Sequence, residues 1–140
     1  MAVPFCLYGS EITMYREGDI AKLEKTQNLV GRWSLGVPST TAVEAIRGEM
    51  GWSTFRERII KGKFNFLKKI EGLQEDRWSR QILAERGNNS SWRREIERWK
   101  RRLDVENDWH RLGMKEVRRR VKENGRIRWK QGMDNKTTLK

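Results

Sequence analysis

The chain has 140 residues, which is enough for one domain of ordinary size. Hydrophobic and charged residues each make up 36 %, so we expect a small helical core and exclude a large one. Cys6 is the only cysteine and His110 the only histidine, which excludes an internal disulfide and a structural zinc site. A single cysteine fits a reducing compartment, so we expect an intracellular protein of the nucleus or cytoplasm.

The formal net charge of +12 is unevenly distributed along the chain. Residues 1–50 hold 5 Lys and Arg against 6 Asp and Glu, whereas residues 51–140 hold 26 against 13. Such asymmetry is typical of a protein that meets a polyanion, either nucleic acid or an anionic membrane surface. A highly charged but merely solvated helical surface would give the same pattern. No run of residues approaches the ~20 apolar positions of a membrane span, and we expect no membrane partner.

The first fifty residues predict two helices. Residues 2–8 are apolar and predict a short strand or a first helical turn. Asp19 is expected to cap a helix that ends at Gly36. The run Thr41-Ala-Val-Glu44 has the pattern of a capping box and predicts a second, short helix that stops near Gly51.

The middle of the chain predicts two further helices. Ser53 is expected to cap a helix with a broad apolar face that Gly72 ends. A short helix over about 75–86 follows, and the stretch from Gly87 to Ser91 has the composition of a linker. We therefore divide the chain into a helical region of residues 1–86 and a basic helical extension of residues 87–140.

The extension begins with a helix capped by Ser90 or Ser91. Its apolar residues recur at steps of 4, 3 and 4, which forms a narrow seam of the coiled-coil kind; they are Trp92, Ile96, Trp99 and Leu103. Another short helix over Val117 and Val121 is expected to break at Gly125, with Trp129 and Met133 in a polar tail. The sequence as a whole predicts an all-α fold of about six or seven short helices.

No arrangement of residues predicts catalysis. Metal-dependent chemistry on nucleic acid needs converging carboxylates. The tight acidic groups here are Glu75-Asp76, which fits the N-terminus of a helix, and the alternation of Asp104, Glu106 and Asp108, which fits a solvated turn. We therefore expect no catalytic residues, no metal and no cofactor.

The basic residues give the clearest functional signal. Cations on the flanks of an apolar helix face can contact phosphates without reading sequence. The predicted set is Arg56, Arg58, Lys61, Lys63, Lys68 and Lys69 on the helix after Ser53, with Arg93, Arg94, Arg101 and Arg102 beyond the linker. Two rival uses of the second region stay open: its seam could bind a partner helix or a second copy, or could simply form the core.

Four short motifs, in order, resemble the reverse transcriptases of non-LTR (LINE-type) retrotransposons. They are LYGSE at 7–11, LEKTQNLVGRWSLGVPSTT at 23–41, IRGEMGW at 46–52 and WKQGMDNKTTL at 129–139. In that family this order is found C-terminal to the polymerase palm, in the thumb and the helical segment after it. Arg32 and Arg47 occupy motif positions, and we add them to the predicted nucleic-acid-binding residues.

The resemblance implies a thumb-like helical bundle with a loosely attached basic C-terminal arm. A thumb holds the template–primer duplex through backbone contacts, so the implied partner is RNA, DNA or RNA–DNA hybrid. The chain contains no Tyr/Phe-x-Asp-Asp palm motif, no endonuclease domain and no zinc knuckle. It is therefore expected to be a non-catalytic fragment of an RNA-directed DNA polymerase, starting just after the palm and unable to polymerise on its own.

Overall fold

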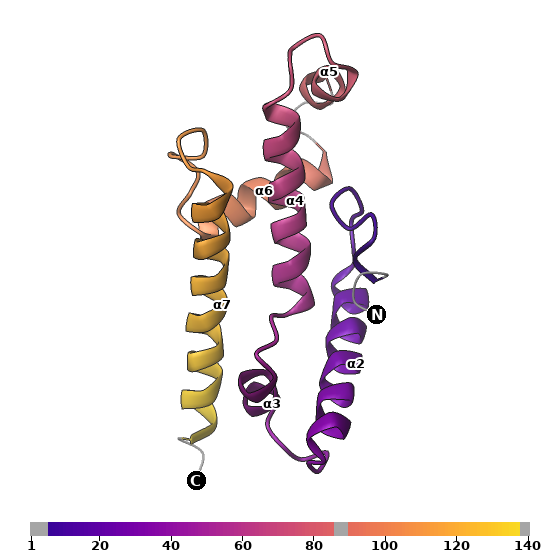
Figure 1. Ribbon diagram of the computed structural model, residues 1–140, viewed down its shortest axis with the longest axis vertical. Helices are drawn as coiled ribbons and strands as arrows, with labels where there is room; N and C mark the ends of the chain where they lie inside the picture. The colour runs from indigo at the N-terminus through magenta and orange to yellow at the C-terminus, as the bar shows by residue number, and fades with distance from the viewer. Residues whose placement is uncertain (1–5, 86–89, 138–140) are drawn as a thin grey trace. The chain divides into compact units, whose positions relative to one another are not determined.

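The structure is a computed structural model that describes residues 6–85 and 90–137, and these residues form helices and connecting turns without any strand (Figure 1). The predicted all-α class is therefore confirmed. The helices are α2 (Glu17–Leu35), α3 (Val43–Met50), α4 (Phe55–Glu71), α5 (Trp78–Glu85), α6 (Ser91–Arg102) and α7 (Met114–Thr137). Of the apolar run at 2–8, residues 2–5 lie outside the described part and residues 6–7 are helical.

The chain divides into two compact units. Unit 1 holds the residues up to Met14 together with Arg58–Val121, and unit 2 holds Tyr15–Glu57 together with the residues from Lys122 onward. The helices α4 and α7 contribute residues to both. This division differs from the predicted boundary at residue 87, because α6 and the first part of α7 share a core with α4.

The core of unit 1 explains the spacing of its apolar residues. It contains Ile60, Phe64 and Leu67 of α4, Ile96, Trp99 and Leu103 of α6, Val105 and Trp109 of the following segment, and Val117 and Val121 of α7. Full burial of a large apolar side chain stabilises a fold by about 1.5–3 kcal/mol. The region after residue 90 is thus fixed to α4 by its own core and is not the loosely attached arm that we expected.

Two glycines end helices in unit 2 as the sequence predicts. Gly36 after α2 has φ 63° and Gly51 after α3 has φ 61°, and the backbone N–H of each donates to carbonyls of the last turn. This left-handed conformation is open to glycine at little steric cost.

Three predicted helix starts are wrong in detail. The helix α2 begins at Glu17, so Asp19 lies in its first turn and is not its cap. No side chain caps α3, because its N-cap position is Ala42 and the predicted capping threonine, Thr41, lies one residue before it. The α4 cap is Thr54, whose hydroxyl accepts from the backbone N–H of Glu57 at 3.1 Å, and not Ser53.

The predicted helix break at Gly125 does not occur. The helix α7 runs without interruption from Met114 to Thr137, so that Trp129 and Met133 are helical residues and not parts of a tail. In unit 2, a Cβ at position 125 would lie 2.3 Å from a carboxylate oxygen of Glu57. A glycine inside a helix costs about 1 kcal/mol relative to alanine, and here it allows the close approach of Glu57.

Candidate nucleic-acid interface

The helix α6 buries apolar residues together with Lys100 in unit 1 and exposes four of its five arginines. Ser90 caps it by accepting a hydrogen bond from the backbone N–H of Arg93 at 3.1 Å. Ile96, Trp99 and Leu103 face inward and are buried. The residues between them on the other side of the helix are therefore directed to solvent.

The two carboxylates of α6 form ion pairs with lysine and arginine side chains near the core. Glu95 forms an ion pair with Lys63 of α4. Glu97 accepts a hydrogen bond from Lys100 at 3.0 Å and lies 3.6 Å from Arg93. Neither acidic side chain is left to compensate the charge on the outer face of the helix.

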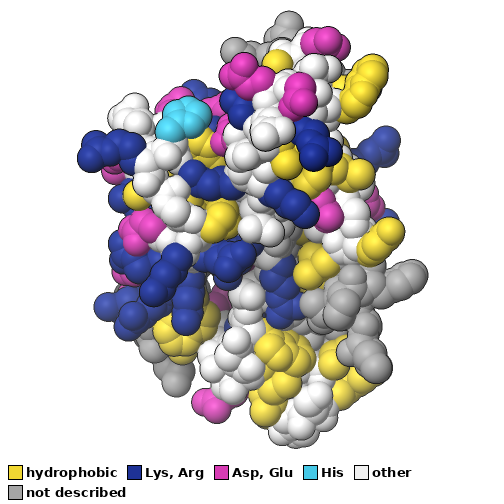
Figure 2. Space-filling view, turned by 45° about the horizontal axis from the view of Figure 1, so that its top comes forward, with side chains coloured by type: hydrophobic (Ala, Val, Ile, Leu, Met, Phe, Trp, Pro, Cys, Tyr) yellow, Lys and Arg dark blue, Asp and Glu magenta, His cyan; other side chains and the backbone are white. Residues whose placement is uncertain are grey.

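That outer face carries a row of four exposed arginines, Arg94, Arg98, Arg101 and Arg102, which we call the α6 arginine row. Arg94 donates to the hydroxyl of Ser91 at 3.3 Å, and the guanidinium of Arg102 lies 5.1 Å from the ring centroid of Trp99. Within the described residues, none of the four forms an ion pair. Lys and Arg side chains are numerous on the protein surface in general, as the one face drawn in Figure 2 shows.

The spacing of the α6 arginine row suits a phosphate backbone. At a rise of about 1.5 Å per residue, the row extends about 12 Å along the helix. Successive phosphates of one strand advance by about 3.4 Å along a duplex axis. Three or four neighbouring phosphates are thus within the length of the row, and an arginine guanidinium binds phosphate oxygens with two parallel N–H donors.

The predicted cations of α4 have mixed placements. Lys63 is fully buried, so it does not project toward solvent as we expected. Lys68 donates to the carbonyl of Trp109, and its amine lies 4.3 Å from the centroid of the Trp109 ring. Burial lowers the pKa of Lys68, and the charge of neighbouring Lys100 lowers it further, whereas Glu71 raises it. Lys69 is exposed and Lys61 is half-buried.

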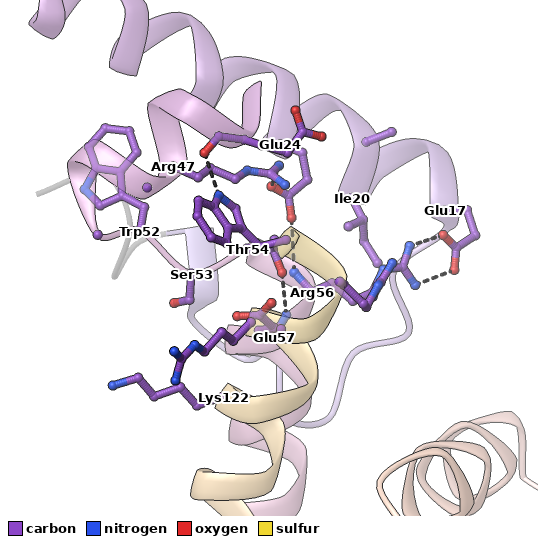
Figure 3. A pocket seen from close by; sticks show the side chains of 18 residues that line it. Glu17, Ile20, Glu24, Arg47, Trp52, Ser53, Thr54, Arg56, Glu57 and Lys122 are labelled. Atoms are coloured by element: carbon purple, nitrogen blue, oxygen red, sulfur yellow. Dashed lines mark hydrogen bonds and ion pairs between the residues drawn. The ribbon is translucent and has the colours of Figure 1, made fainter. Parts of the chain in front are cut away.

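Three of the remaining predicted cations form hydrogen bonds with carbonyl or carboxylate groups within unit 2. In unit 2, Arg32 donates to the carbonyl of Thr41 at 3.0 Å, Arg47 to Glu24 at 2.8 Å, and Arg56 to Glu17 at 2.9 Å; Figure 3 shows the last pair face to face. Arg58 of unit 1 is half-buried. Of all the predicted residues, only Arg94, Arg101 and Arg102 lie together on one exposed face.

Arg98 completes this face, and the sequence prediction omitted it. The sequence does contain a pattern that could have identified Arg98, because Arg94, Arg98 and Arg101 follow one another at steps of four and three. That spacing places them on the same side of a helix. The dense charge of the neighbouring residues hid the pattern.

A second basic surface lines a groove of about 620 Å³ in unit 2 (Figure 3). One wall comes from α7, through Lys122, Gly125, Arg126, Arg128 and Trp129. The other walls come from α2, α3 and the segment that leads into α4. The sequence prediction missed the α7 wall because it placed a helix break at Gly125.

The apolar seam of α6 is not a free surface. Ile96 is 0 % exposed, and Trp99 and Leu103 are 6 % exposed within the core of unit 1. Trp92 packs edge-to-face on Phe66 with ring centroids 6.3 Å apart. The seam therefore forms the core, which was one of the two uses that the sequence left open, and does not offer a surface to a partner helix.

Comparisons with known proteins give no match, whether to family models, to curated proteins or to solved structures. Among the described helices, none has the length and apolar character that crossing a membrane requires. A function for this chain is therefore inferred from the chemistry of its two basic surfaces.

Proposed function

We propose that this chain is a non-catalytic nucleic-acid-binding module that holds a duplex by its phosphate backbone. The observation that carries the proposal is the α6 arginine row, four exposed guanidinium groups on one face of a helix whose carboxylates are engaged elsewhere. Such a surface binds a polyanion by releasing its condensed counterions. Contacts to the phosphate backbone carry no information about base sequence.

The sequence motifs support a specific kind of duplex. They resemble the thumb region of non-LTR retrotransposon reverse transcriptases, which suggests RNA–DNA hybrid of the template–primer type as the preferred partner. The chain carries no palm aspartates, so we expect no primer extension by the purified protein. Extension of a primed RNA template would contradict this part of the proposal.

The test is fluorescence anisotropy with a labelled RNA–DNA hybrid over a series of salt concentrations. We expect the double variant Arg98→Gln/Arg101→Gln to bind more weakly and to lower the steepness of the salt dependence by about 0.9 for each lost phosphate contact. Both side chains are exposed, so their replacement should leave the fold intact.

A charge-matched control separates a specific surface from general attraction. Lys22 and Lys25 of α2 are also exposed, and Lys22→Gln/Lys25→Gln removes the same charge. This control should bind hybrid almost as tightly as the wild type. An equal loss in both double variants, or weak binding that does not respond to salt, would refute the proposal.

A further inference from the structure

Trp129 is held in a fixed position at the groove of unit 2 while part of its ring stays open. Its indole N–H donates to the backbone carbonyl of Glu44 at 2.6 Å. Its six-membered ring packs on Gly48, where a Cβ would lie 3.1 Å from Cζ2. The residue nevertheless remains 39 % exposed. A rigid, partly open indole is a ready platform for a flat ligand.

Two cations flank this platform on the same face of α7. Lys122, Arg126 and Trp129 follow at steps of four and three, and all three line the groove. Along the helix axis, Lys122 is about 6 Å from Arg126 and about 10 Å from Trp129. Lys122 and Arg126 are exposed, and neither forms a hydrogen bond or ion pair within the described part of the chain.

The acidic residues of the groove do not cancel these two charges. Glu17 is paired with Arg56, Glu24 with Arg47, and Glu44 with Lys136. Glu57, the fourth carboxylate of the lining, also has interaction partners of its own. The Glu57 carboxylate lies against Gly125 of the α7 wall, and Lys122 and Arg126 project on that wall beside an exposed aromatic ring without an ion pair to any of the four carboxylates.

We propose that this groove binds single-stranded nucleic acid, with one base stacked on Trp129 and the adjacent phosphates held by Lys122 and Arg126. An aromatic ring beside cations is the usual means of binding single strands without sequence preference. A paired base is already stacked on its neighbours, so the strand must be unpaired to use the ring. The inference rests on the proposed function for the class of partner, but it concerns a different surface.

The test compares a short labelled uridine oligomer with an abasic oligomer of equal length, which keeps the phosphates and lacks the bases. Wild-type protein should bind the uridine oligomer about tenfold more tightly, as expected for one stacked base. Trp129→Leu should abolish this preference, and Trp129→Phe, which keeps a flat ring, should retain most of it. Lys122→Gln/Arg126→Gln should weaken both oligomers alike.

Several results would overturn the inference. One is equal affinity of wild-type protein for the two oligomers, which would show simple anion binding. Another is an unchanged preference in Trp129→Leu, with folding of that variant checked by circular dichroism. A third is full displacement of the uridine oligomer by an acidic peptide at equal charge, which would indicate a protein partner.

The two proposals fail separately. The variant Arg98→Gln/Arg101→Gln should leave the affinities for both oligomers almost unchanged, because neither arginine lines the groove. If this variant binds hybrid as tightly as the wild type, the α6 arginine row is not the duplex interface. The preference for the uridine oligomer over the abasic oligomer still tests the groove in that case. If the preference is absent but hybrid binding falls, only the groove inference is lost.

Discussion

The amine of Lys63 on α4 forms an ion pair with the carboxylate of Glu95 on α6, and the two side chains differ sharply in exposure. The Lys63 side chain is 1 % exposed, whereas that of Glu95 is 20 % exposed. A buried charge depends on its partner because it cannot be hydrated instead. The pair therefore fixes one helix of unit 1 against the other at a polar point beside the apolar core.

This asymmetry predicts unequal effects of removing the two partners. Glu95→Ala leaves a charged amine without a carboxylate in the interior, and we expect it to lower the free energy of unfolding by about 3 kcal/mol. Lys63→Met keeps the aliphatic volume and leaves the Glu95 carboxylate where water can reach it. This variant should therefore lower the free energy of unfolding by less than Glu95→Ala does. Urea unfolding monitored by circular dichroism measures both.

The double variant Lys63→Met/Glu95→Ala is the control. It removes both charges, and it should be more stable than Glu95→Ala alone. If Lys63→Met proves the more damaging single change, the unpaired carboxylate of Glu95 costs more than the unpaired amine of Lys63, and the argument from exposure is wrong.

Gly31 gives a second prediction, in unit 2. A Cβ at this position of α2 would lie 2.6 Å from Cγ2 of Ile46 and 3.2 Å from the ring of Trp52. Overpacking of this kind lowers the free energy of unfolding by about 1–3 kcal/mol. Alanine forms helices better than glycine, which raises the free energy of unfolding by about 1 kcal/mol. Gly31→Ala should therefore destabilise the protein by up to about 2 kcal/mol, as measured by its thermal midpoint and urea unfolding.

Gly18 is the matched control on the same helix. A Cβ at this position would have no neighbouring atom within 4 Å, so alanine there meets no clash and restricts the unfolded chain. Gly18→Ala should be neutral or stabilising by up to about 1 kcal/mol. Equal effects of the two substitutions would show that α3 is not packed against α2 at Gly31.

The positions of the helices followed from the sequence because local rules govern them. Apolar spacing predicted the buried faces of α4 and α6, and glycines at 36, 51 and 72 predicted where three helices end. The first residue of each helix was harder to predict. At the start of α4, for example, Ser53 and Thr54 are both residue types that cap helices well. The predicted helix break at Gly125 was wrong because a glycine is tolerated inside a helix where a neighbouring side chain, here Glu57, occupies the space of a Cβ.

The roles of individual cations could not be read from the sequence in the same way. Lys63 and Arg98 are both basic residues on amphipathic helices, yet one is buried against Glu95 and the other is exposed. The difference depends on which helix packs on which face, and that is a tertiary property. The helical spacing of the arginines on α6 was present in the sequence, but the dense charge around them hid it.

The N-terminus of α6 offers a prediction that separates two adjacent serines. The hydroxyl of Ser90 accepts the hydrogen bond of the cap, whereas that of Ser91 accepts a hydrogen bond from the exposed side chain of Arg94. Loss of an N-cap costs about 1 kcal/mol. Ser90→Ala should therefore lower the free energy of unfolding by about that amount, and Ser91→Ala should leave it almost unchanged. A larger effect at Ser91 would show that α6 begins one residue later.

Glu116, in the first turn of α7, makes stability depend on pH. The hydrogen bond from Arg119, at 2.9 Å from Nε, and further contacts with Arg120 lower the pKa of the Glu116 carboxyl to about 2. Because the pKa is lower in the folded state than in the unfolded chain, the contribution of the ionised carboxylate is complete above about pH 4.5. It is lost as the pH falls toward 2.

The corresponding test compares Glu116→Gln with the wild type across this range. The variant should be less stable at pH 7, and the difference should shrink as the pH falls from about 4.5 to about 2, because the wild-type carboxyl then becomes protonated as well. Glu123→Gln is the control, since Glu123 is exposed on the same helix and forms no ion pair within the described residues. A stability difference for Glu116→Gln that stays constant with pH would mean that the glutamine disturbs packing and that the ion pairs with the two arginines contribute nothing.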